Sequence, residues 1–189
     1  IINTAMKFIL GRKLNMTQVF DKDGIVHPAT MVEAAPGIVT QVKTKETDGY
    51  TAVQISSKKA KLESKKEFRL DTPSQKVGDS IDLSQFAIGD VVRISSISKG
   101  KGFQGVVKRH GFGGGPRTHG QKHSEREPGS IGGGLRNKVP KKMRMAGRMG
   151  GDRITVKNLK VVHIDLPSNT IYIGGAVPGR RGTLVEITA

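Results

Sequence analysis

The chain of 189 residues is 35% hydrophobic and only 4% aromatic, and its 32 lysines and arginines against 16 acidic residues give a net charge of +16. This composition supports one modest hydrophobic core, and so large a surplus of positive charge indicates an anionic partner, with nucleic acid as the leading candidate. The absence of cysteine excludes disulfides and thiolate metal sites, and no apolar run approaches the roughly 20 residues that span a bilayer. We therefore expect a soluble, cytoplasmic protein with no membrane partner. Met6 is a candidate initiator, with residues 1–5 as an upstream extension.

The first part of the chain is predicted to form short β-strands. Its sequence alternates runs rich in β-branched and apolar residues with turn signals. The turn DKDG at residues 21–24 is typical of a hairpin, and Asp48-Gly49 marks another turn. The predicted runs are 6–11, 16–21, 25–34, 37–43 and 51–57.

A basic patch follows at residues 58–69, with six cations against Glu63 and Glu67. The patch has helical character but only a weak apolar stripe, so a solvated face and a binding site are both open interpretations. We expect a small basic insertion near residues 58–70.

Further predicted strands lie on either side of a glycine-rich tract. The strand-like segments are 88–98, 154–166, 170–179 and 183–188, with a turn at 167–169. Many short strands without alternating long helices favour a mainly β fold, a closed antiparallel barrel or a sandwich. The β domain is expected to comprise residues 1–98 and 152–189.

The segment between these strands, residues 99–151, concentrates the charge. It holds thirteen lysines and arginines against Glu125 and Glu127, which is +11 of the total +16, and 15 of the 25 glycines. Five aliphatic side chains cannot offset about 1–2 kcal/mol of backbone entropy per residue over this length. We expect an extended loop inserted between two strands, largely disordered until a partner orders it. A plain flexible linker is the alternative.

A glycine motif in this segment suggests nucleotide binding at first sight. Gly100, Gly102 and Gly105 spell G-x-G-x-x-G, but the glycines and proline at 111–116 would break a following helix within two turns. No kinase or Walker motif accompanies it. His119 and His123 have no convincing third metal ligand. The sequence therefore predicts no enzyme, no cofactor and no metal site.

The same residues suit threading through a folded RNA, because glycine lets the backbone pass close to a groove while cations neutralise phosphates. No helix-turn-helix, zinc finger or basic zipper favours DNA. The candidate RNA ligands are Lys99, Lys101, Lys108, Arg109, Arg117, His119, Lys122, Arg126, Arg136, Lys138, Lys141, Lys142, Arg144 and Arg148. The candidate points of close approach are Gly100, Gly102, Gly105, Gly132, Gly133, Gly134 and Gly147.

Several ordered motifs resemble one family. They are GRKLNMTQVF, SKGKGFQGVVKRHGF, THG, PGSIG, MAGRMGG followed by ITVKNLKVV, and GAVPG. Together they resemble the bacterial-type large-subunit ribosomal protein L3 family from Met6 onward.

The resemblance implies a closed antiparallel barrel of the translation-protein type and a loop reaching through rRNA toward the peptidyl-transferase centre. It implies binding of 23S rRNA near its 3′ end, a role in nucleating subunit assembly, and location in the cytoplasmic ribosome. Large-subunit proteins fourteen and nineteen are the implied neighbours, and no homo-oligomer is expected. By position, residues 128–146 would lie deepest, with residues 99–109 and Arg148 lining the shaft.

Two other functions remain open on the residues alone. A free RNA-binding or RNA-annealing protein would use the same basic segment. A nucleotide-dependent enzyme built on the glycine motif is a more distant alternative.

Overall fold

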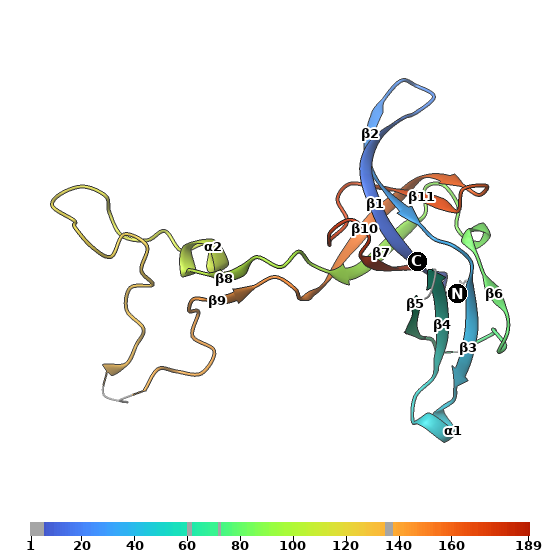
Figure 1. Cartoon of the computed structure of the whole chain (residues 1–189), viewed down its shortest axis with the longest axis horizontal. Helices are drawn as coiled ribbons and strands as arrows, with labels where there is room; N and C mark the ends of the chain where they lie inside the picture. The colour runs from blue at the N-terminus through green and yellow to red at the C-terminus, as the bar shows by residue number, and fades with distance from the viewer. Residues whose placement is uncertain (1–5, 60–61, 72, 135–137) are drawn as a thin grey trace. The chain divides into compact units, whose positions relative to one another are not determined.

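The computed structural model describes residues 6–59, 62–71, 73–134 and 138–189, and the chain divides into two compact units. The first unit comprises Ile1–Ser98 together with Arg153–Ala189, and the second is Lys99–Asp152. Figure 1 labels most elements of both. In the described part of the chain, no helix has both the length and the apolar character needed to cross a membrane.

The larger sheet of the first unit is a closed barrel. Each of its six strands pairs antiparallel with two neighbours, and the ring closes because the last strand in the order also pairs with the first. Around the ring the strands are β1 (Phe8–Phe20), β12 (Leu184–Thr188), β7 (Val91–Ile97), β10 (Arg153–Asp165), β11 (Thr170–Gly174) and β2 (Val26–Glu33).

A second antiparallel sheet of four strands belongs to the same unit. Its order is β5 (Leu62–Arg69), β4 (Ala52–Lys59), β3 (Gly37–Lys43) and β6 (Ser80–Ile81). The short helix α1 (Lys45–Asp48) connects β3 to β4 and ends at Gly49, which adopts the left-handed conformation. The 3₁₀ helix η1 (Leu83–Gln85) begins after Asp82, whose carboxylate accepts a hydrogen bond from the Ser84 amide.

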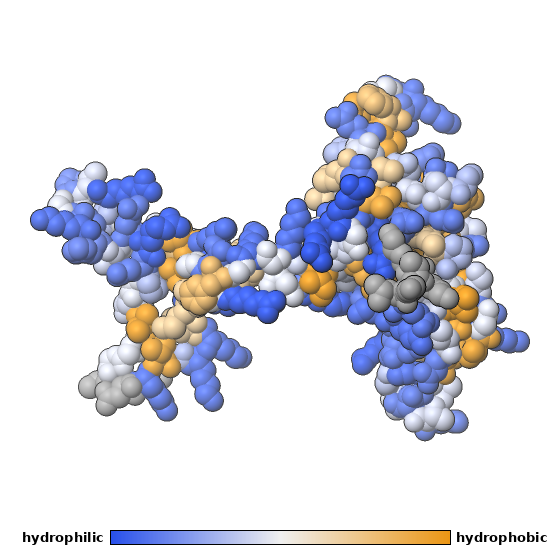
Figure 2. All heavy atoms as spheres, in the orientation of Figure 1, coloured by the Kyte–Doolittle hydropathy of each residue, from blue (hydrophilic) through white to orange (hydrophobic). Residues whose placement is uncertain are grey.

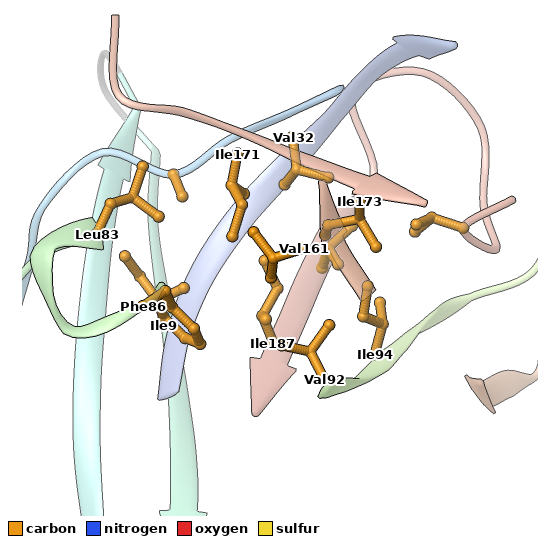
Figure 3. Packing of buried hydrophobic residues seen from close by; sticks show 13 residues of the cluster. Ile9, Val32, Leu83, Phe86, Val92, Ile94, Val161, Ile171, Ile173 and Ile187 are labelled. Carbon is orange, nitrogen blue, oxygen red and sulfur yellow. The ribbon is translucent and has the colours of Figure 1, made fainter. Parts of the chain in front are cut away.

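Strand β1 supplies side chains to two hydrophobic cores. Successive residues of a strand point to opposite faces, so Ile9 packs inside the barrel whereas Phe8 and Leu10 pack against the second sheet. The barrel core draws isoleucines and valines from all six strands of the ring (Figure 3). Because each fully buried aliphatic side chain contributes about 1.5–3 kcal/mol, the two cores give this unit its own source of stability.

The mainly β class predicted from the sequence is confirmed, and so is the hairpin turn at residues 21–24, where the Gly24 amide donates to the Asp21 carbonyl. The first two predicted runs are one strand, β1, which is irregular between Lys13 and Met16.

The helical character assigned to residues 58–69 is wrong in the part that the structure describes. Strands β4 and β5 form an antiparallel hairpin, and Phe68 of β5 is buried opposite Val53. Pairing with β4 and burial of Phe68 outweigh helix propensity here. Residues 60–61 of that patch lie outside the described residues.

Candidate nucleic-acid interface

The second unit, hereafter the arm (Lys99–Asp152), contains local structure of its own. Strands β8 (Gly102–Gln104) and β9 (Gly147–Met149) form a two-stranded ribbon, extended by a hydrogen bond from the Lys101 amide to the Met149 carbonyl (2.9 Å). Val106 is the one buried hydrophobic residue in the described part of the arm. Backbone pairing gives this ribbon order that apolar burial cannot, and disorder of the rest of the arm before a partner binds stays a prediction.

Helix α2 (Val106–His110) follows the ribbon strand β8 and is only five residues long. It begins after Gly105 and ends at Gly111, which adopts the left-handed conformation with φ 72°. Its last turn is basic, which is favourable at the negative end of the helix dipole. The prediction that the glycine tract would end this helix early is confirmed, and a single turn is not the helix that a dinucleotide-binding motif requires.

Arg109 holds two distant parts of the arm together. Its guanidinium donates to the Met145 carbonyl at 2.6 Å, and His110 Nε2 lies 3.0 Å from the same oxygen. A Cβ at Gly147 would lie 2.7 Å from Arg109 Nη1, so the glycine makes room for the guanidinium. Arg109 and Gly147, both predicted to face RNA, thus have partners within the arm.

Two further arginines of the arm also have partners in it. The Arg144 guanidinium lies over the Phe112 ring at 5.0 Å from its centroid, within the range of a cation–π interaction. Arg117 pairs with the Glu125 carboxylate at 2.6 Å. The loop around this pair folds back on itself, because the Gly115 amide donates to the Glu125 carbonyl at 3.0 Å.

The other described cations of the arm are exposed and have no ion pair, side-chain hydrogen bond or cation–π contact among the described residues. His119 is exposed as well, with φ 59°. Figure 2 shows the arm's visible surface as largely hydrophilic. Arg136, also a predicted ligand, lies outside the described residues. The nine cations are Lys99, Lys101, Lys108, Lys122, Arg126, Lys138, Lys141, Lys142 and Arg148.

The predicted close-approach glycines fall into two groups. Gly102 and Gly132 adopt positive φ, and Gly147 faces the Arg109 guanidinium, so the arm's own conformation favours glycine at these three positions. The remaining four have no positive φ and open space where a Cβ would stand. They are Gly100, Gly105, Gly133 and Gly134.

A basic groove in the first unit was missed by the sequence analysis. It is a hollow of about 380 Å³ that strands β5, β7, β10 and β12 line together. Its cations are Arg69, Arg93, Arg153 and Lys157. The available signal was the period-two spacing of Arg153, Thr155 and Lys157, which places all three on one face of a strand. The remaining groove cations come from strands distant in sequence.

Two carboxylates in this basic groove have cationic partners. Glu67 is hydrogen-bonded to Lys43 and to Tyr50, and these bonds lower its pKa. Lys43 Nζ donates to the Tyr50 hydroxyl at 2.6 Å and also bonds to Glu67, and these two hydrogen bonds, the Tyr50 one first, raise the pKa of Lys43. Glu186 pairs with Arg153 and, at 3.4 Å, with Lys66. Arg69 lies over the Tyr50 ring, and Arg93 donates to Thr188 Oγ1. Among the described residues, Lys157 has no ion pair, side-chain hydrogen bond or cation–π contact, so it is the groove cation with most capacity for an external anion.

No group of three or more His, Asp or Glu side chains among the described residues is arranged to hold a metal ion. His119 and His123 have no third metal ligand among the residues that the structure describes.

A mainly β unit joined to an arm whose nine cations have no partner among the described residues is typical of a polyanion-binding protein. The family model described as Ribosomal protein L3 matches residues 58–170. Relatives named Large ribosomal subunit protein uL3 match over nearly the whole chain. The relative from Herpetosiphon aurantiacus is 46% identical over 95% of this chain and 94% of its own, and that from Streptococcus pyogenes serotype M6 is 45% identical over 96% and 95%. The relative from Bacillus cytotoxicus is 43% identical over 96% of this chain and 95% of its own.

The chain belongs to the ribosomal protein L3 family. This family is structural and non-enzymatic.

Proposed function

We propose that the chain, a structural constituent of the large ribosomal subunit by its family, binds 23S rRNA through the arm. In this proposal it binds near the 3′ end of the rRNA, helps to nucleate subunit assembly and directs the arm toward the peptidyl-transferase centre. The barrel of the first unit is then of the translation-protein type. Large-subunit proteins fourteen and nineteen are its expected neighbours. The protein acts in the cytoplasm as part of the ribosome.

The observation that carries this proposal is the set of nine unpartnered cations in the arm. A cation without a protein partner keeps its capacity to neutralise a phosphate and release a condensed counterion, which is the main source of salt-dependent nucleic-acid affinity. The described part of the arm also buries almost no apolar surface, so an RNA partner would supply contacts that the arm cannot make with itself.

The alternative functions differ in what they predict. A free RNA-annealing protein would dissociate from large subunits at high salt, whereas a subunit constituent would co-sediment with them. A nucleotide-dependent enzyme would need a longer helix after the glycine motif than α2 provides.

A deletion tests the proposal because the first unit closes without the arm. Ile97 at the end of β7 and Arg153 at the start of β10 are paired in register. A hairpin loop of about 2–5 residues can join paired antiparallel strands. We would replace residues 99–151 with a short Gly-Ser loop and compare both proteins for binding to large-subunit rRNA in a filter-binding assay.

We expect the shortened protein to keep its cooperative thermal unfolding and to lose most of its rRNA affinity. Undiminished affinity in a folded deletion variant would place RNA binding in the first unit and refute the role assigned to the arm. The basic groove would then be the first region to test.

A further inference from the structure

At every glycine of the first unit, either the backbone conformation or a close neighbouring atom disfavours a larger residue. Seven of them adopt positive φ between 75° and 99°, where other residues are strained. The other three are crowded, since a Cβ would lie 2.5 Å from Val32 at Gly11, 3.2 Å from the Ser56 carbonyl at Gly37 and 3.3 Å from Val162 at Gly174. The fold of this unit therefore accounts for each of its glycines.

At five glycines of the arm, neither a positive φ nor crowding explains the choice of glycine. They lie outside the left-handed region, and a Cβ built on them meets no described atom within 4 Å. The five are Gly100, Gly105, Gly113, Gly133 and Gly134. Within the protein alone they are a net cost, because glycine loses more backbone entropy on ordering than alanine does.

The surroundings of two of these glycines indicate what they face. Gly100 lies between Lys99 and Lys101, two of the unpartnered cations. Gly113 follows Phe112, whose ring lies under Arg144. The amides of Gly100 and Gly113 donate no hydrogen bond to another described residue, so both donors are available to phosphate or sugar oxygens.

We propose that the arm's backbone lies directly against RNA at these five glycines, at a distance that leaves no room for a Cβ. The inference rests on the proposed rRNA binding and refines it. Gly113 joins the set of close-approach positions, whereas Gly102, Gly132 and Gly147 leave it because the arm's own fold explains them. The cations beside these positions bind phosphates, and the glycines set how closely the chain approaches the groove.

A simpler explanation of these glycines is chain flexibility, and the two explanations predict opposite signs. If the glycines supply only flexibility, alanine restricts the free arm and leaves rRNA affinity unchanged or raises it. If RNA occupies the space, alanine introduces a clash and weakens binding. The overpacking cost known from protein interiors corresponds to a loss of affinity of about 5- to 150-fold.

The test compares Gly100→Ala, Gly113→Ala and Gly133→Ala in the full chain by filter binding to large-subunit rRNA. Ser74→Thr is the matched control, since it adds one carbon to an exposed residue of the first unit, outside the arm. Without RNA, the melting temperature of each variant should equal that of the wild type, because no described atom contacts the added methyl group of the alanine variants. We expect weaker binding for the three alanine variants and wild-type binding for the control.

Each outcome separates this inference from the proposed function. Wild-type or tighter binding by all three alanine variants would overturn the close approach while rRNA binding by the arm stands. Equal losses of rRNA affinity in the control and the alanine variants would also overturn it, since an added carbon at any exposed position would then weaken binding. Failure of the wild-type chain to bind rRNA would refute both.

Discussion

The salt dependence of rRNA binding should report the arm's unpartnered cations directly. We would replace Lys138, Lys141 and Lys142 together with alanine. All three are exposed and have no partner among the described residues, so their loss should leave the arm's internal contacts in place. The matched control replaces Lys22, Lys45 and Lys76, three exposed lysines of the first unit, and changes the net charge by the same amount.

The magnitude follows from the number of cations available. If all nine bind phosphates, the slope of log affinity against log salt should lie between about −6 and −8, at roughly −0.7 to −0.9 for each contact. Removing three contacts should make this slope shallower by about 2 to 3. Between 50 and 200 mM salt, the loss of affinity should then shrink by about 20- to 40-fold relative to the wild type.

Filter binding to large-subunit rRNA across that salt range measures the slope for each protein. We expect the arm variant to have the shallower slope and the control to match the wild type. Equal changes of this slope in the two variants would mean that net charge, and not the placement of cations in the arm, determines the affinity for rRNA. The reasoning from unpartnered cations would then fail.

Three further predictions concern single positions. Gly150→Ala would place a Cβ 2.1 Å from the Lys99 carbonyl oxygen at φ 74°, and it should raise amide hydrogen exchange across the β8–β9 ribbon without lowering the melting temperature of the first unit. The hydrogen bond from Lys7 holds the pKa of Asp90 below its ordinary 3.8, so its stabilisation is present above about pH 4 and is lost as the pH falls through the native value. The stability difference between wild type and Asp90→Asn should accordingly shrink on acidification, in thermal unfolding from pH 7 to pH 2. Lys157→Glu should weaken rRNA binding if RNA enters the basic groove, and Lys45→Glu provides the matched charge reversal outside it.

The sequence predicted what local composition and turn chemistry determine. The β class, the hairpin at residues 21–24 and the early end of α2 at Gly111 all follow from nearby residues. It failed at β5, where Phe68 is buried by pairing with a neighbouring strand and a short polar run gives no clear period. The weak periodicity of such a run does not show whether tertiary pairing will override helix propensity.

The candidate nucleic-acid interface was likewise predicted from the sequence only in part. Clustering of cations in residues 99–151 was visible in the sequence, but their partners were not. Arg109 bonds to a carbonyl 36 residues away, and no local pattern announces that contact. The basic groove was equally hidden, because its residues come from four strands that only the fold brings together.

The arm's cations divide by residue type, and this leads to a last prediction. All three that have partners within the arm are arginines, Arg109, Arg117 and Arg144, whereas seven of the nine unpartnered ones are lysines. A planar guanidinium can donate in a fixed direction and stack on a ring, and a lysine ammonium cannot reproduce both.

Arg109→Lys should therefore loosen the contact to Met145 despite conserving charge, whereas Lys141→Arg should leave the free arm unchanged. Amide hydrogen exchange in α2 and β9 of the free protein distinguishes the two, with faster exchange expected only for Arg109→Lys. If amide exchange in both variants equals that of the wild type, a positive charge at position 109 is enough to keep the contact with Met145, and the guanidinium is not required. Arg109 would then return to the set of cations available to RNA.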